Sequence, residues 1–139
     1  MTHPSKPVGV GIILLNTGNE ILLILRDDNP SIPYPNMWDL PGGHLEAGET
    51  PEETIRREMM EELELDLGEL RLFREYHHDA FDEYVFVKHF DRNPDELPLH
   101  EGQRCRFFSR EEIEKTNLAY SYNRVLSDFY AAIEAQGPG

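Results

Sequence analysis

The stretch at residues 43–65, GHLEAGETPEETIRREMMEELEL, constrains the fold more than any other part of the chain. It combines a glycine at its start with two separate signals for the beginning of a helix. Thr50 and Glu53 match a capping box, and Pro51 suits the first helical position, where no backbone donor is missed. The sequence therefore predicts a helix that begins at Pro51 and runs to about Leu63.

This helix would carry an apolar face for packing and an acidic face beside it. Apolar residues repeat at helical spacing as Ile55, Met59 and Leu63. Glu58, Glu61 and Glu62 fall within an arc of roughly 100° next to that stripe. Arg57 can reach Glu61 one turn away, so it can orient the acidic side chains as well as balance their charge.

Carboxylates crowded on one helical face repel each other. By itself such a face is most simply explained as a solvated surface. Here it follows Pro41-Gly42-Gly43, where we expect a tight turn that lets the backbone approach closely. Because hard divalent cations prefer oxygen ligands, the two features together favour a cation site. Mg²⁺ fits best, since it binds a few carboxylates together with substrate phosphates, and Mn²⁺ is the usual substitute.

The same residues resemble the Nudix box, whose pattern is G-x5-E-x7-R-E-U-x-E-E-x-G-U, with U bulky and apolar. The fixed positions are matched by Gly43, Glu49, Arg57, Glu58, Glu61 and Glu62. The apolar positions are filled by Met59 and Leu65. Glu64 stands where the family usually has glycine, which can leave a helix in a left-handed conformation. Because glutamate tolerates that conformation poorly, we expect the helix to end differently, by another turn through Leu65.

The resemblance implies an α/β fold, the Nudix-type α/β/α sandwich with a mixed β-sheet, formed by residues 1–139 as a single domain. It implies a hydrolase that cleaves a diphosphate linkage in a nucleoside diphosphate derivative by metal-assisted attack of water on phosphorus. The nearest activities are those of nucleoside triphosphate and oxidised-guanine-nucleotide diphosphatases. The implied metal ligands are the carbonyl of Gly43 and the carboxylates of Glu58, Glu62 and Glu61. Glu49 would support Arg57, which would act on catalysis by orienting the acidic groups.

Three residues outside the box resemble parts of the site in nucleotide-hydrolysing Nudix enzymes. Glu101, within His100–Gln103, corresponds to a late-loop carboxylate that binds metal or acts as general base, and a solvated loop acid is the alternative. Glu61 and Glu101 therefore both remain candidates for the general base. Arg26 lies where such enzymes place a cationic substrate contact, and an exposed strand end is the alternative. Asn123 lies where enzymes that clear oxidised guanine nucleotides carry a purine-reading asparagine, although a plain helix-start residue is the favoured explanation.

The sequence leaves the substrate open. Hydrolysis of nucleotide sugars or capped RNA ends is the alternative within the enzyme class, because the loop Asp27–Asn36 could admit a base or a sugar. A different class is a non-catalytic, nucleotide-binding Nudix sensor, but such domains often lose box carboxylates that this chain keeps. Four aromatic residues could stack on a base, although packing is the commoner role for such positions: Tyr34, Phe81, Tyr120 and Tyr122.

Composition limits the partners. The formal net charge is −14, from 27 acidic and 13 basic residues among 139. Nucleic acid is therefore not expected as a partner, since duplex recognition relies on cationic patches. One cysteine, Cys105, suits a reducing compartment, and no signal peptide or membrane-length apolar run is evident. We expect a cytoplasmic protein that acts on a small-molecule nucleotide away from membranes. The family resemblance also makes a homodimer an option.

Strands and helices are predicted in an α/β order. The predicted strands are Val8–Asn16, Ile21–Arg26, Met37–Leu40, Leu70–His78, Glu83–Asp91 and Arg104–Phe108. A second capping box at Ser109–Glu112 opens a short helix. A final amphipathic helix is predicted at Tyr120–Ala135, with a frayed tail at residues 136–139.

Overall fold

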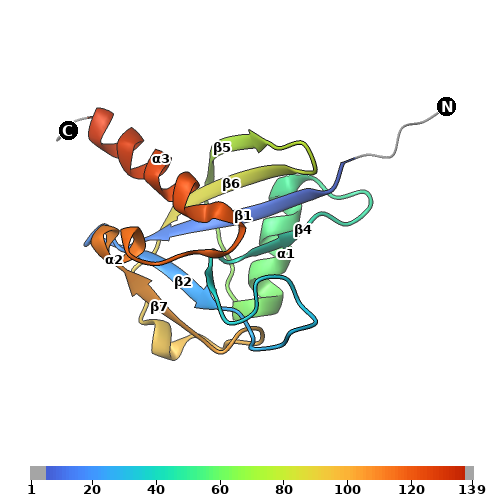
Figure 1. Ribbon diagram of the computed structural model, residues 1–139, viewed down its shortest axis with the longest axis horizontal. Coiled ribbons are helices and arrows are strands. Elements are labelled where there is room, and N and C mark those ends of the chain that lie inside the picture. The colour runs from blue at the N-terminus through green and yellow to red at the C-terminus, as the bar shows by residue number, and fades with distance from the viewer. Residues whose placement is uncertain (1–5, 137–139) are drawn as a thin grey trace.

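The computed structural model describes residues 6–136, which form seven strands and three α-helices (Figure 1). The strands are β1 (Val8–Leu15), β2 (Ile21–Leu25), β3 (Trp38–Asp39), β4 (Gly42–His44), β5 (Arg71–His77), β6 (Asp82–His89) and β7 (Arg104–Phe108). The helices are α1 (Pro51–Leu63), α2 (Arg110–Glu114) and α3 (Tyr122–Ala135), with short 3-10 helices η1 (Pro94–Glu96) and η2 (Ala119–Ser121). In this part of the chain, no helix is both long enough and apolar enough to cross a membrane.

The strands form one mixed sheet in the order β3-β2-β1-β6-β5, with β4 beside β1 and β7 beside β2. β1 and β6 run parallel and pair along the whole of β1, from Val8 opposite Asp82 to Leu15 opposite His89. The other pairs are antiparallel. The prediction of a mixed α/β sheet is confirmed.

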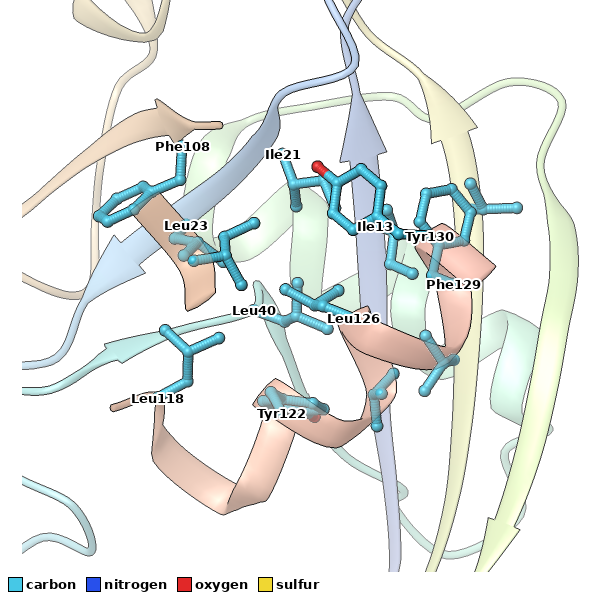
Figure 2. Close-up of a cluster of buried hydrophobic side chains, with 14 of the residues drawn as sticks. Ile13, Ile21, Leu23, Leu40, Phe108, Leu118, Tyr122, Leu126, Phe129 and Tyr130 are labelled. Carbon is cyan, nitrogen blue, oxygen red and sulfur yellow. The ribbon is translucent and has the colours of Figure 1, made fainter. Parts of the chain in front are cut away.

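The two faces of the sheet are covered by different helices. Successive residues of a strand point to opposite faces, so β1 contributes to two separate cores. Ile13 packs in a cluster with Leu126 and Phe129 of α3, which Figure 2 shows. Ile12 lies in the other cluster, with Met59 of α1. Figure 1 shows α1 and α3 on opposite sides of the sheet, which is the predicted sandwich.

The glycine pair lies in a strand, so the prediction of a turn there is wrong. Gly42 and Gly43 belong to β4, which pairs antiparallel with the first half of β1. A Cβ atom on Gly42 would lie 2.0 Å from the carbonyl oxygen of Val10. Glycine is therefore needed because two strands approach closely, and the pairing fixes the strand that faces α1.

The end of α1 also differs from the prediction. The helix ends at Leu63, and Glu64 caps it in the left-handed conformation, with φ 51° and ψ 41°. The N–H of Leu65 donates to the carbonyl of Met59, which closes the exit in place of a further turn. Glutamate therefore occupies the conformation that the resemblance assigns to glycine.

The last helix begins two residues later than predicted. Tyr120 and Ser121, the last two residues of η2, have φ values of 56° and 60°. The backbone is left-handed at both, so η2 and α3 do not form one continuous helix. α3 therefore starts at Tyr122. Gln136 caps its C-terminus, and residues 137–139 of the predicted tail lie outside the described residues.

Candidate active site

The N-terminus of α1 is fixed by the predicted capping box. The hydroxyl of Thr50 accepts from the N–H of Glu53, and the Glu53 carboxylate accepts from the N–H of Thr50. This start sets the rotation of the helix and so decides which side chains face the sheet. Glu58 faces β4 so closely that a Cβ on Gly43 would lie 2.2 Å from its Cδ. Only glycine at position 43 leaves room for that carboxylate.

Arg57 ties this helix to the segment before it. Its Nε and Nη2 atoms donate to both carboxylate oxygens of Glu49, at 2.7 and 3.0 Å. Its Nη1 donates to Glu58 at 2.9 Å and to Glu61 at 3.3 Å. The hydrogen bonds that Arg57 donates to Glu49 lower the pKa of the Glu49 carboxyl to about 2. The same bonds raise the pKa of the Arg57 guanidinium above its usual value. Arg57 therefore stays charged and holds the acidic side chains in position.

An open cavity of about 730 Å³ lies over this part of the sheet. Its walls include Gly43, Glu58 and Glu62, which come from the box, and Glu101 and Arg26, which come from outside it. Residues far apart in the sequence, predicted separately, are thus brought to one place. Glu61 is different, because its side chain is 59% exposed and is not among the residues that line the cavity.

Burial disfavours the charged form of two carboxyl groups that line the cavity, those of Glu58 and Glu62. Burial, reinforced by the neighbouring Glu101, raises the pKa of Glu62 to about 10. Burial also raises the pKa of Glu58, against the opposing effect of Arg57. Within residues 6–136, two buried side-chain oxygens lack a hydrogen-bond partner: Oε2 of Glu62 and Oδ1 of Asp39. Such groups favour a bound positive charge, which would let them ionise.

The donor set fits a magnesium or manganese ion. Glu58 and Glu62 offer hard oxygen ligands, the second with an unpartnered oxygen, and Gly43 leaves the space that Glu58 occupies. In the described part of the chain, no three acidic, histidine or cysteine side chains already form an assembled metal site. Mg²⁺ does not require one, because it commonly takes one or two carboxylates and completes its shell with waters and substrate phosphates.

Arg26 lies in the cavity wall but is partly engaged. It forms an ion pair with Asp39 at 3.1 Å and donates to the carbonyl of Pro33 at 2.8 Å. Its guanidinium also sits 5.4 Å from the ring centroid of Tyr120. The contacts fix the side chain at the edge of the cavity with its charge partly balanced. A substrate group would therefore meet an oriented cation beside an aromatic ring.

Asn123 takes a different place from the one predicted. Its Oδ1 accepts from the N–H of Leu118, and its Nδ2 donates to the carbonyls of Ile113 and Thr116. The amide thus holds the chain between α2 and η2 and is not among the residues that line the cavity. A purine would have to displace these three bonds, so the structure assigns Asn123 a structural role.

Two acidic residues of the cavity were missed by sequence reasoning. Burial raises the pKa of Asp39 to about 7 and also raises the pKa of Glu83, which shares a hydrogen bond with Tyr122. Both are buried and line the cavity together with Phe81. The only signal for Asp39 was an acid between the apolar residues of a short strand. No sequence pattern marked Glu83, because only the parallel pairing of β6 with β1 brings it to the site.

Comparison with known proteins finds relatives that match part of this chain. A putative 8-oxo-dGTP diphosphatase of Bacillus subtilis is 44% identical over 54 residues, which cover 39% of this chain and 32% of that protein. The m7GpppN-mRNA hydrolase NUDT17 of Xenopus laevis is 40% identical over 63 residues, which cover 45% of this chain and 21% of that protein. The chain thus spans less than half the length of these curated relatives.

The fold and the family are shown over most of the chain. A solved MutT structure, from work on Aliivibrio salmonicida and Vibrio cholerae, superposes with a TM-score of 0.75 at 23% identity. The superposition covers 92% of this chain and 99% of that one. The NUDIX domain family model matches residues 5–129. The chain therefore belongs to the NUDIX domain family.

Proposed function

We propose that this protein hydrolyses a diphosphate linkage in a nucleoside diphosphate derivative, such as a nucleoside triphosphate, and that it requires Mg²⁺. The observation that supports this most is the grouping of Glu58, Glu62 and Glu101 in one cavity, where burial raises the pKa of Glu58 and of Glu62. Phosphates are anionic, and a cavity lined by acids repels them without a bridging cation. The similarity to 8-oxo-dGTP diphosphatases supports the same reaction class.

Glu58, Glu62 and the carbonyl of Gly43 would hold the metal. When bound, the metal supplies charge neutralisation for the phosphate oxygens and lowers the pKa of water. Arg57, held by Glu49, would keep Glu58 aimed into the cavity. Arg57 is thus a positioning residue in this account.

Glu101 is the better candidate for the general base. It lines the cavity and lies close enough to Glu62 to share a hydrogen bond when one of the two is protonated. The side chain of Glu61 is exposed to solvent beside Arg57 and lies outside the cavity, so it is poorly placed to accept a proton from a water inside the cavity. A base must lie within hydrogen-bond reach of the attacking water, and that requirement favours Glu101. Glu61 would then tune the charge around Arg57.

Arg26 is the proposed substrate contact in the wall of the cavity. Phe81 and Tyr120 line the cavity as well, and Tyr120 carries the guanidinium of Arg26 over its ring. An aromatic wall with one cation suits a nucleoside joined to phosphates. We leave Asn123 out of the substrate contacts because its amide is already bound.

Hydrolysis of a capped RNA end is the second candidate. The similarity to the m7GpppN-mRNA hydrolase of Xenopus laevis favours it, since that protein's name describes such a substrate. The net charge of −14 argues for a short or free nucleotide over a long RNA chain.

The test is a phosphate-release screen with a coupled phosphatase or pyrophosphatase. The panel contains nucleoside triphosphates, oxidised guanine nucleotides, nucleotide sugars, dinucleoside polyphosphates and a capped dinucleotide. We expect turnover of at least one triphosphate with Mg²⁺ or Mn²⁺, and none with EDTA. Turnover of the capped dinucleotide alone would favour the second candidate. Tight nucleotide binding without turnover of any compound would contradict catalysis and indicate a sensor domain.

A further inference from the structure

Glu64 holds an unfavourable backbone conformation next to the site. Its φ of 51° is left-handed, where a side chain with a Cβ is strained and glycine is not. Strain of this kind persists when surrounding contacts hold it, and an observed outlier is a reason to look for a role. The contacts made by its side chain therefore show what the glutamate does that glycine could not.

The Glu64 side chain reaches the segment that carries Glu101. Its Oε2 lies 2.6 Å from Nε2 of His100. The N–H of His100 donates to the carbonyl of Glu62 at 2.8 Å. His100 is thus attached through its side chain and its backbone to the last residues of α1 and to the cap. Glu101 follows it directly.

The other end of this short segment is fixed as well. Gly102 has a φ of +88°, and a Cβ there would lie 2.6 Å from Ile24. Gln103 donates from its amide to the carbonyl of Arg26 at 2.8 Å and to Oδ1 of Asn36 at 2.9 Å. The segment 100–103 is therefore held at both ends, and Glu101 lies between the two attachments.

We propose that Glu64 and His100 are positioning residues that hold Glu101 beside Glu62 in the cavity. The proposal rests on the proposed role of Glu101 as general base and deepens it. Both side chains of the pair are more than half exposed, at 58% and 53%. An exposed ion pair adds little to stability, and the left-handed glutamate subtracts from it. The pair is therefore better explained by positioning than by stability of the fold.

Three variants separate positioning from stability. Glu64→Gly removes the contact and relieves the strain, so its Tm should stay equal or rise by a few degrees. Its kcat should fall by about ten-fold, the lower end of the range seen when a supporting residue is lost. Glu64→Gln keeps an acceptor for the imidazole N–H and should keep kcat within about two-fold. His100→Ala should match Glu64→Gly in kcat, and the double variant should be no slower than either single one.

The matched control is Asn19→Gly. Asn19 is also left-handed, with φ 60°, but it lies in the turn between β1 and β2, away from the cavity. It should leave kcat unchanged, which shows that a glycine at a left-handed position does not itself slow the enzyme.

A second measurement does not depend on turnover. Hydrogen exchange at the His100 amide should quicken several-fold in Glu64→Gly, because the side-chain contact that backs its bond to Glu62 is gone. Full kcat together with unchanged exchange in Glu64→Gly would overturn the positioning proposal. If the wild-type protein is inactive but exchange at the His100 amide still depends on Glu64, the proposed function is contradicted. The contact between Glu64 and His100 would still be supported.

Discussion

Gly43 sets the space for the first carboxylate of the site. A Cβ at this position would lie 2.2 Å from Cδ and 2.5 Å from Oε1 of Glu58, so alanine must displace the carboxylate. We expect Gly43→Ala to lower kcat on the order of 100-fold, because small displacements of reacting groups have effects of that size. Steady-state kinetics with Mg²⁺ measures it. Gly18→Ala is the control, since a Cβ there meets nothing closer than 3.5 Å. Equal activity of the two variants would contradict this role.

Asp39 makes stability depend on pH in a defined direction. Burial raises its pKa from 3.8 to about 7, against the opposing effect of Arg26. The folded protein therefore keeps a proton that the unfolded chain releases. That contribution is fully present below about pH 4 and is lost as the pH rises through about 7. In EDTA, the Tm of the wild type should fall between pH 5 and 8 relative to that of Asp39→Asn, by roughly 5 °C. Parallel curves for the two proteins would show that Asp39 ionises normally.

At the scale of elements, Arg57 joins α1 to the segment between β4 and the helix. It contacts both oxygens of Glu49, the carboxylate of Glu58 and the carbonyl of His44. Lysine keeps the charge but cannot donate in this forked geometry. We expect Arg57→Lys to lower kcat by roughly 10- to 100-fold, as loss of a supporting partner does.

Arg56→Lys is the matched control for that change. Arg56 neighbours Arg57 on the same helix, and within residues 6–136 its side chain bonds only to the exposed Glu52. Its lysine variant should retain kcat and Tm. A loss of activity in both variants alike would point to helix stability in place of carboxylate positioning.

Elements defined by local patterns were predictable from the sequence. α1 begins at Pro51 because its capping box is local, and β7 has the predicted bounds of Arg104–Phe108. β4 was not predictable, because its pairing with β1 depends on residues far away in the chain. The left-handed end of α1 at Glu64 was not predicted either, because glutamate tolerates that conformation poorly, and its side chain contacts the distant His100. Local rules alone therefore favoured the wrong exit.

The candidate site follows the same division. Glu58 and Glu62 could be named because the box spaces them along one helix. Asp39 and Glu83 could not, since each is a single acid in a strand and only the sheet brings them to the cavity. The bonds of Asn123 could not be predicted, because its amide is used by the backbone of a neighbouring segment, which no sequence pattern reveals.

For the whole molecule, charge is the main constraint on function. The net charge is −14, and the cavity concentrates acids further, with Arg26 as the one cation among the residues that line it within the described chain. Under the proposed function we therefore expect a phosphate substrate to be accompanied by metal, and activity to be lost when the metal or its buried ligand is removed.

The most direct test is kcat with saturating Mg²⁺ for Glu62→Gln, beside the control Glu52→Gln on the exposed side of α1. Glu62 is protonated at neutral pH without metal, since burial raises its pKa to about 10, so the amide should leave the fold and Tm intact. We predict a loss of at least about 100-fold for Glu62→Gln, the scale of losing charge stabilisation at a reacting phosphate. The control should be unchanged. A folded Glu62→Gln protein with wild-type kcat would contradict the account.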